Sequence, residues 1–526
     1  MPDTSIPRLV SRLESLFEGL ETDFHRAYWD AQIEATPPRE ARRAELELEL
    51  RRAKGDPAAF EAVREALDEE VHDPVLRRQL EVLRLSLTGN QMDDLHRSEL
   101  VRLSSAIEGD FATFRPEVEG RRVTDNDIEE ILRTSADEGV RRQAWTASKH
   151  VGALTAERVK DLVRVRNSVA LELGFADYYR MALELQEIPE GWLFDRLDEL
   201  ETLTLEPYRA WKVDLDESLR RRFGTAHVMP WHYADPFFQT LPPDGRVQLD
   251  DHLRRSDPTA LALRTFSSWD IDLSAVLEAS DLYPRDLKSQ HAFCLDVDRS
   301  GKDVRILANI VPGELWTEIV LHECGHAAYD ASIDPKLPYL LRRASHTFVT
   351  EAIAILSGRQ VREPRWLEEI AGVSADEVAA IEEDLRTAAS ADSLQFARWG
   401  LVMTHFERDL YADSEGDLDA RWWDHVARFQ LVTPPEDPPA GAWAAKIHLA
   451  TAPVYYHNYL LGELLASQLA ETARNEFGGL IGTPAAGRFL VERVFRPGAF
   501  LRWDSLIEQA TGKGLSARAF VAEFVA

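Results

Sequence analysis

The chain has 526 residues, of which 44% are hydrophobic and 29% charged, a balance typical of a globular protein with a large core. Its 91 acidic residues outnumber its 61 basic residues, and the formal charge of -30 argues against nucleic acid or an anionic membrane surface as a partner. Two cysteines are too few for a disulfide scaffold in a chain of this size, so we expect a reducing, cytoplasmic location.

The first 220 residues are predicted to form a succession of amphipathic helices. Apolar residues recur there every three or four positions, as in EARRAELELELRRAKGD. Charges interrupt the apolar residues of the first twenty positions, which argues against a secretion signal. No stretch has the roughly 20 apolar residues of a membrane-spanning helix, so no membrane partner is expected.

A break rich in proline and aromatic residues occupies residues 227–245, and helical patterns resume after it. The best strand candidates are HAFCLDVD at 291–298 and DVRILANIV at 303–311, which RSGK joins as a predicted hairpin. A proline-rich connector at 433–441 then interrupts an otherwise helical pattern. No internal repeat is found. The predicted fold is therefore mostly α, with a small β-hairpin or sheet.

The segment LHECGHAAYD contains two histidines four residues apart. On a helix, His322 and His326 share one face and can each direct a nitrogen at one ion, with Glu323 beside them. An ordinary helix with two buried histidines is the alternative. A hydrolytic zinc needs a third protein ligand and an open position, and Glu351, on the next predicted helix, is the candidate. The sequence thus predicts one Zn²⁺ ion held by His322, His326 and Glu351.

Five segments, in chain order, resemble the successive active-site segments of angiotensin-converting-enzyme-type peptidases: HAFCLDVDRSGKDVRI, LHECGHAAYD, TEAIAILSG, RWWDHVARFQLVTPP and AKIHLATAPVYYHNYL. The thimet oligopeptidase family is a more distant relative. The clear resemblance spans about residues 230–465, whereas the N-terminal helices match only in character. It implies two helical lobes flanking a deep substrate groove. We expect one catalytic domain over 1–526, with a helical N-terminal part (1–220) and a zinc- and substrate-binding part (221–526).

Hydrolysis of a peptide at zinc needs a base for the attacking water, and Glu323 is placed to take its proton and later protonate the leaving amine. The oxyanion that forms needs hydrogen-bond donors. The family supplies a histidine and a tyrosine, to which His448 and Tyr459 correspond. The tyrosine segment aligns only with a one-residue shift, but the family has two tyrosines three residues apart, as Tyr456 and Tyr459 are. Tyr459 is therefore assigned to the oxyanion and Tyr456 to a neighbouring substrate contact, with Tyr455 as its rival.

The resemblance also implies residues that bind the peptide. His291 corresponds to a histidine that hydrogen-bonds a substrate carbonyl, and Ala292 to the residue whose backbone pairs with the peptide as an added strand. Lys446 corresponds to the lysine that binds the terminal carboxylate, with Gln239 as its assistant. The family has an aspartate at the position of Ile355, where it orients a zinc histidine, so that support is expected from another residue here.

The sequence therefore predicts a zinc metallopeptidase that acts on short peptides and releases C-terminal dipeptides. No obligate protein partner can be inferred. An endo-acting oligopeptidase of the thimet type is the first alternative, and Lys446 argues against it because such an enzyme needs no free carboxylate. A catalytically silent peptide-binding scaffold is the second, and Glu323 together with three ligands argues against that.

Overall fold

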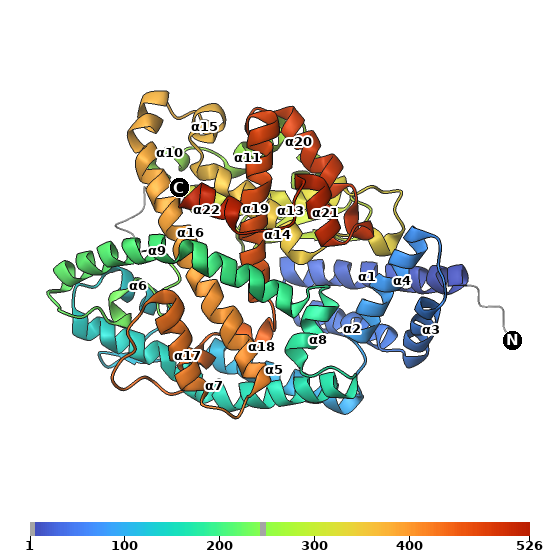
Figure 1. The fold of residues 1–526 in the computed structure, drawn as a ribbon, viewed down its shortest axis with the longest axis horizontal. Helices are drawn as coiled ribbons and strands as arrows, with labels where there is room; N and C mark the ends of the chain where they lie inside the picture. Colours follow the sequence, from blue (N-terminus) through green and yellow to red (C-terminus); the bar gives the residue numbers. More distant parts are fainter. Residues whose placement is uncertain (1–5, 242–248, 526) are drawn as a thin grey trace. The chain divides into compact units, whose positions relative to one another are not determined.

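The structure is a computed structural model that describes residues 6–241 and 249–525 (Figure 1). Helices make up most of the described chain, and its strands form two short antiparallel pairs. The predicted mostly-α fold is confirmed. Residues 242–245 of the predicted proline-rich break lie outside the described residues. Among the described residues, no helix has both the length and the apolar content needed to cross a bilayer.

The chain divides into two compact units, each built from separate stretches of sequence. Unit 1 comprises residues 1–91, 248–382 and 461–519. Unit 2 comprises residues 92–247, 383–460 and 520–526. Because both units draw on both predicted parts of the chain, the boundary expected near residue 220 does not coincide with theirs. The single catalytic domain and its groove stay predictions.

The elements of unit 1 are α1 (Ile6–Ile33), α2 (Pro37–Lys54), α3 (Pro57–Asp68), α4 (Pro74–Thr88), α10 (Asp250–Leu253), α11 (Pro258–Ser268), α12 (Ser274–Ala279), β3 (Phe293–Asp296), β4 (Val304–Leu307), α13 (Glu314–Ser332), α14 (Thr347–Arg359), α15 (Pro364–Trp366), α20 (Pro484–Leu490) and α21 (Trp503–Thr511). Those of unit 2 are α5 (Asp94–Thr113), β1 (Glu117–Val118), β2 (Arg121–Arg122), α6 (Asp125–Thr134), α7 (Glu138–Glu172), α8 (Tyr178–Leu185), α9 (Glu190–Phe223), α17 (Leu418–His425) and α18 (His448–Thr451). Both units include parts of α16 (Ala375–Ala412), α19 (Tyr456–Phe477) and α22 (Arg518–Phe524).

The N-terminal helices of unit 1 start and pack as their sequence predicts. Asp56 and Asp73 each accept a hydrogen bond from the backbone two residues on, and the proline that follows each of them is the first helical residue. Apolar residues three or four apart on α1 then meet those of α3 and α4 in one core. Its fully buried members include Leu9, Val10, Leu13, Phe17, Val63, Leu80, Leu83 and Leu87.

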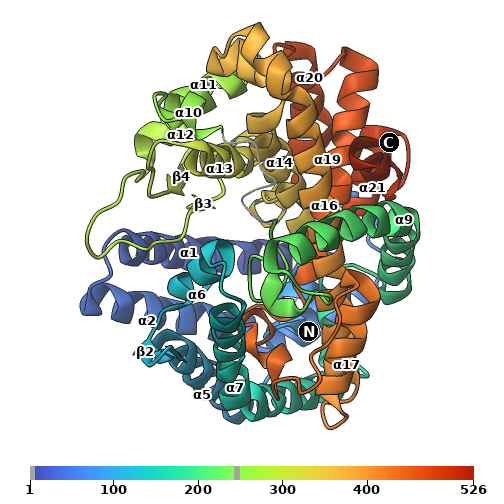
Figure 2. The same cartoon turned by 90° about the vertical axis from the view of Figure 1, so that its left-hand side faces the viewer.

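The predicted hairpin is present beside α13, although its strands are shorter than predicted (Figure 2). β3 and β4 pair from Phe293 with Leu307 to Asp296 with Val304. Beyond β4, the backbone N–H groups of Ala308 and Ile310 donate to the carbonyls of residues 281 and 282 instead. The chain before β3 therefore lacks that strand partner, and His291 and Ala292 precede the strand on which they were expected.

A second hairpin, β1–β2, was not predicted. Its strands have two residues each, too few to show an alternating pattern. Its turn places Glu119 at φ 51° and Gly120 at φ 72°, the left-handed conformations that a tight hairpin needs.

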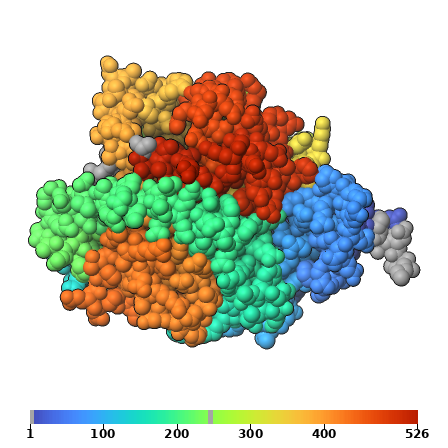
Figure 3. Space-filling view, in the orientation of Figure 1, coloured from blue at the N-terminus to red at the C-terminus, as the bar shows by residue number. Residues whose placement is uncertain are grey.

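In unit 2, α7 supports the segment that ends at Lys446. A Cβ atom on Gly152 would lie 2.1 Å from the carbonyl oxygen of Gly441, so only glycine permits this contact. Gly441 itself has φ +68°. The short 3-10 turn Ala442–Ala445 is thereby seated on α7. On the surface of the same unit, α9 and the segment around α17 adjoin (Figure 3), where Arg428 forms an ion pair with Glu201.

A buried ion cluster ties α1 and α2 to the hairpin loop of unit 1. The carboxylate of Glu21 accepts from Lys54 at 2.6 Å and from the hydroxyl of Tyr339 at 2.7 Å, and lies 2.7 Å from the guanidinium of Arg299. Burial would raise the pKa of Glu21, but the two cations and the hydroxyl lower it to about 2. Burial also lowers the pKa of Lys54, so desolvation of the lysine offsets part of the gain.

We predict that Glu21→Gln lowers the free energy of unfolding by about 3 kcal/mol at neutral pH, because it leaves two buried cations without their carboxylate. Since the folded-state pKa of Glu21 is depressed, its contribution is present above pH 4.5 and is lost as the pH falls toward 2. Urea unfolding should therefore show a difference from wild type that shrinks on acidification. The exposed Asp23→Asn on the same helix is the control, and an equal loss there would contradict the prediction.

Candidate functional site

The two helices that carry the predicted zinc ligands pack unusually closely in unit 1. A Cβ atom on Gly325 would lie 2.7 Å from the Cα of Ala354 and 2.9 Å from the carbonyl oxygen of Ile353. Only glycine allows α13 to approach α14 at this point. The approach brings Glu351, on α14, to the face of α13 that carries His322 and His326.

The three predicted ligands converge. Nε2 of His322 lies 3.8 Å from a carboxylate oxygen of Glu351, and Nε2 of His326 lies 4.0 Å from the same oxygen. One donor atom from each residue falls within 4.8 Å of the other two. Ligands of a tetrahedral zinc are separated by roughly 3.4 Å when each bond is about 2.0 to 2.1 Å long. Two imidazoles and a carboxylate at these distances therefore fit one zinc ion after small inward shifts.

Both histidines carry a neutral imidazole, which is the form that binds a metal ion. Burial lowers the pKa of His322 to about 4, and burial together with His322 lowers the pKa of His326 to about 3. Nδ1 of His326 lies 2.7 Å from the hydroxyl oxygen of Thr350. With the proton on Nδ1, this hydrogen bond leaves the lone pair of Nε2 directed toward Glu351. Thr350 thus supplies the orienting contact that Ile355 cannot make.

Glu323 lies beside the ligands and is buried, with 7% of its surface exposed. Burial and the negative charge of Glu351 raise its pKa to about 8, and the backbone N–H of Cys294 in β3 opposes this by hydrogen bonding. A cation held by the ligands would favour the carboxylate form. Glu323 and His322 line a hollow of about 320 Å³ together with Ile355. The carboxylate therefore borders a space large enough for reacting groups.

A second set of predicted residues gathers in unit 2. Nζ of Lys446 donates to the side-chain oxygen of Gln239 at 2.9 Å. The ammonium group also lies 5.4 Å from the ring centroid of Phe237 and 5.3 Å from that of Trp399. Burial lowers the pKa of Lys446 to about 8, although Asp235 and a neighbouring glutamate oppose the shift. The lysine is thus a partly desolvated cation with aromatic walls.

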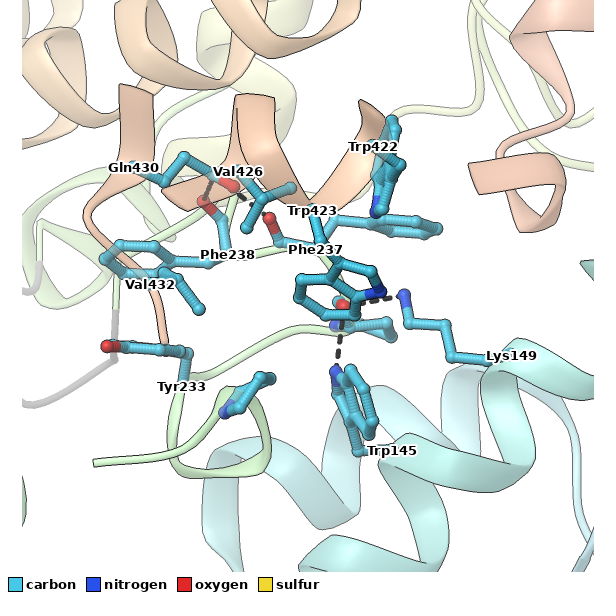
Figure 4. Close-up of a pocket in the computed structure, with 12 residues that line it drawn as sticks. Trp145, Lys149, Tyr233, Phe237, Phe238, Trp422, Trp423, Val426, Gln430 and Val432 are labelled. Carbon is cyan, nitrogen blue, oxygen red and sulfur yellow. Dashed lines mark hydrogen bonds between the residues drawn. The ribbon is translucent and has the colours of Figure 1, made fainter. Parts of the chain in front are cut away.

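The loop that carries Gln239 is fixed by an aromatic pocket (Figure 4). Nζ of Lys149 and the indole N–H of Trp145 both donate to the carbonyl oxygen of Pro236, at 2.7 and 3.1 Å. The side-chain amide of Gln430 donates to the carbonyl oxygen of Phe238 at 2.8 Å. These contacts pin the backbone on both sides of Phe237 and hold Gln239 next to Lys446.

The predicted histidine and tyrosines form one aromatic group in unit 2. The ring centroids of His448 and Tyr456 are 5.4 Å apart, and those of Tyr456 and Tyr459 are 5.5 Å apart. The ring of Tyr455 lies 5.2 Å from that of Tyr459. The hydroxyl of Tyr456 accepts from the indole N–H of Trp399 at 3.0 Å. Tyr456 is buried, whereas Tyr459 is half-buried.

His448 is neutral in this setting because burial, together with the charge of Lys446, lowers its pKa to about 4. Its buried Nδ1 makes no hydrogen bond to the described part of the chain. Trp399 and Phe237 were missed by sequence reasoning. Trp399 lies in an ordinary helical pattern and Phe237 in the break rich in proline and aromatic residues, and only long-range packing brings them to Lys446.

The structure therefore assembles the predicted residues in two sets. Unit 1 holds His322, Glu323, His326 and Glu351, and also His291 and Ala292. Unit 2 holds Gln239, Lys446, His448, Tyr455, Tyr456 and Tyr459. His291 is exposed and Ala292 is half-buried. The use of both sets in one reaction stays a prediction.

Comparison with known protein families gives a match in the N-terminal part of the chain. A family model described as angiotensin-converting enzyme matches residues 3–209. This stretch precedes the motif segments at 230–465 and covers helices whose sequence resembles the family only in character. The resemblance to this peptidase family is thereby confirmed from a separate part of the chain. No curated protein matches the sequence.

We predict that Glu351→Ala lowers the zinc content of the purified protein, because two histidines alone leave a zinc site incomplete. Thr350→Val should weaken zinc affinity by about 10-fold, since loss of the hydrogen-bond partner of a zinc histidine typically lowers affinity by about 10- to 100-fold. Metal analysis and competition with a chelator would measure both effects. Thr350→Ser retains the hydroxyl and is the matched control. Full zinc retention by Glu351→Ala would place the third ligand elsewhere.

Proposed function

We propose that this chain, which resembles the angiotensin-converting enzyme family, is a zinc-dependent peptidase that releases dipeptides from the C-terminus of short peptides. The observation that carries the proposal is the convergence of His322, His326 and Glu351 with Glu323 beside them. A merely structural zinc site has four protein ligands and needs no adjacent carboxylate. Three ligands with a flanking carboxylate are instead the arrangement that hydrolysis uses.

The chemical roles follow from the residue types. When bound, zinc supplies the Lewis acid for the hydrolysis. Glu323 takes a proton from the attacking water, whose oxygen bonds to the scissile carbonyl carbon, and returns that proton to the amine as the C–N bond breaks. In this proposal, His448 and Tyr459 donate hydrogen bonds to the oxyanion.

Recognition of a C-terminus is assigned to Lys446 and Gln239. An ammonium group in a partly desolvated aromatic setting binds a carboxylate more strongly than an exposed lysine does. Gln239 already holds that group in place. Tyr456 would contact the same end of the peptide, while His291 and the backbone of Ala292 would hold the extended substrate upstream.

We predict that Glu323→Gln lowers kcat by about 10² to 10⁴-fold, because the variant keeps the metal ligands and loses only the proton acceptor. Cleavage of a quenched peptide would measure the loss. Zinc content and melting temperature, measured on the same samples, should stay near those of wild type. Normal activity in this variant would remove Glu323 from the mechanism, and lost zinc would make its role structural.

We predict that Lys446→Ala raises KM for free-acid peptides by about 10- to 100-fold and leaves KM for the matching C-terminal amides nearly unchanged, because a charge-assisted hydrogen bond is lost only when the carboxylate is present. In wild type, KM for the free acid should rise as the pH passes about 8, where Lys446 loses its charge. The amide should show no such rise. Equal effects on both substrates would favour an endo-acting oligopeptidase.

A further inference from the structure

Val454 has a backbone conformation that its side chain disfavours. Its φ is +52°, in the left-handed region, where a β-branched residue is a genuine outlier. It is also buried, with 1% of its surface exposed. The residue lies two positions before the start of α19, immediately ahead of Tyr455 and Tyr456. The strained residue therefore lies at the point where the tyrosine-bearing helix begins.

Two side chains from other elements hold the backbone of Val454. The carboxyl oxygen of Glu407, on α16, accepts from its N–H at 2.7 Å. The side-chain amide of Gln186, at the end of α8, donates to its carbonyl oxygen at 3.1 Å. The side-chain oxygen of Gln186 also accepts from the amide of Asn458 at 3.1 Å. Both polar groups of one strained residue are therefore bound, and the first turn of α19 is tied to the same glutamine.

Glu407 is buried, so water does not compete for its hydrogen bond to the backbone of Val454. Its side chain is buried, and burial raises its pKa to about 8 although Val454 and Arg166 oppose the shift. A carboxyl oxygen accepts from the N–H in either protonation state. Arg166 in turn donates to the carbonyl oxygens of Leu449 and Ala450, at 3.3 and 2.6 Å. The segment between His448 and α19 is thus held at both ends by buried side chains.

We propose that Glu407 and Gln186 are positioning residues, which keep Val454 in the left-handed conformation and thereby set the orientation of Tyr456 and Tyr459. The inference rests on the proposed function, in which these tyrosines contact the substrate and the oxyanion. Without the carboxyl oxygen, Val454 relaxes toward the conformations that valine prefers, and the start of α19 turns with it.

The test first removes the acceptor oxygen of Glu407, and a second substitution then removes the backbone strain at Val454. Glu407→Ala should lower kcat by about 10-fold, because Val454 then leaves the strained conformation that orients the tyrosines. Glu407→Gln keeps the acceptor oxygen and should stay near wild type. Val454→Gly added to Glu407→Ala should recover most of the activity, because glycine adopts positive φ without strain. Asp409→Ala, on the same helix, removes a carboxylate that binds His425 and should leave kcat unchanged.

A second readout separates this inference from the proposed function. The protein contains 12 tyrosines, and 3-fluorotyrosine labelling with Tyr456→Phe and Tyr459→Phe would assign their two ¹⁹F resonances. Both resonances should shift in Glu407→Ala and return in the double variant, whether or not the protein cleaves peptides. Resonances that do not move, or a glycine that restores neither signal nor activity, would overturn the inference. Absent peptide cleavage with the expected ¹⁹F shifts would overturn only the proposed function.

Discussion

The predicted metal site depends on the close approach of α13 and α14 at Gly325. A side chain at that position would meet the backbone of Ala354 at 2.7 Å and push the helices apart. Glu351 would then move away from His322 and His326, which share one helix and cannot follow it. Because all three donors and Glu323 project from two packed helices, their geometry is set by the scaffold and needs little ordering when a metal binds.

Buried polar contacts fix the segments around this centre and around the predicted substrate residues. In unit 1, Glu21 ties the hairpin loop to the first two helices. In unit 2, Lys149 holds the loop before Gln239, and Glu407 holds the turn before Tyr455. Apolar packing alone allows a side chain several positions. A buried polar group that loses its hydrogen bond, in contrast, lowers the stability of the fold. The contacts of Lys149 and Glu407 thereby fix segments that carry predicted substrate residues, and those of Glu21 fix the hairpin loop.

The sequence predicts what depends on local geometry. Two ligands four residues apart mark a helix face, and apolar spacing marks the N-terminal helices. The ends of the hairpin were not predictable, because they depend on pairing of Ala308 and Ile310 with residues some 27 positions earlier. The contacts of Thr350, Trp399 and Glu407 could not be predicted from the sequence for the same reason. Their roles come from contacts between distant elements, and their residue types carry no signal of their own. The family match over 3–209 likewise lies in helices whose spacing alone indicated only amphipathic character.

In the proposed function, the zinc ligands and Glu323 serve peptide hydrolysis directed to a C-terminus. Mass spectrometry of the products from a mixed library of short peptides, incubated with the zinc-loaded protein, tests it most directly. We expect free-acid peptides each to lose a C-terminal dipeptide, amidated copies to be spared, and a chelator to stop the reaction until zinc is restored. Intact peptides at full zinc occupancy would contradict the claim.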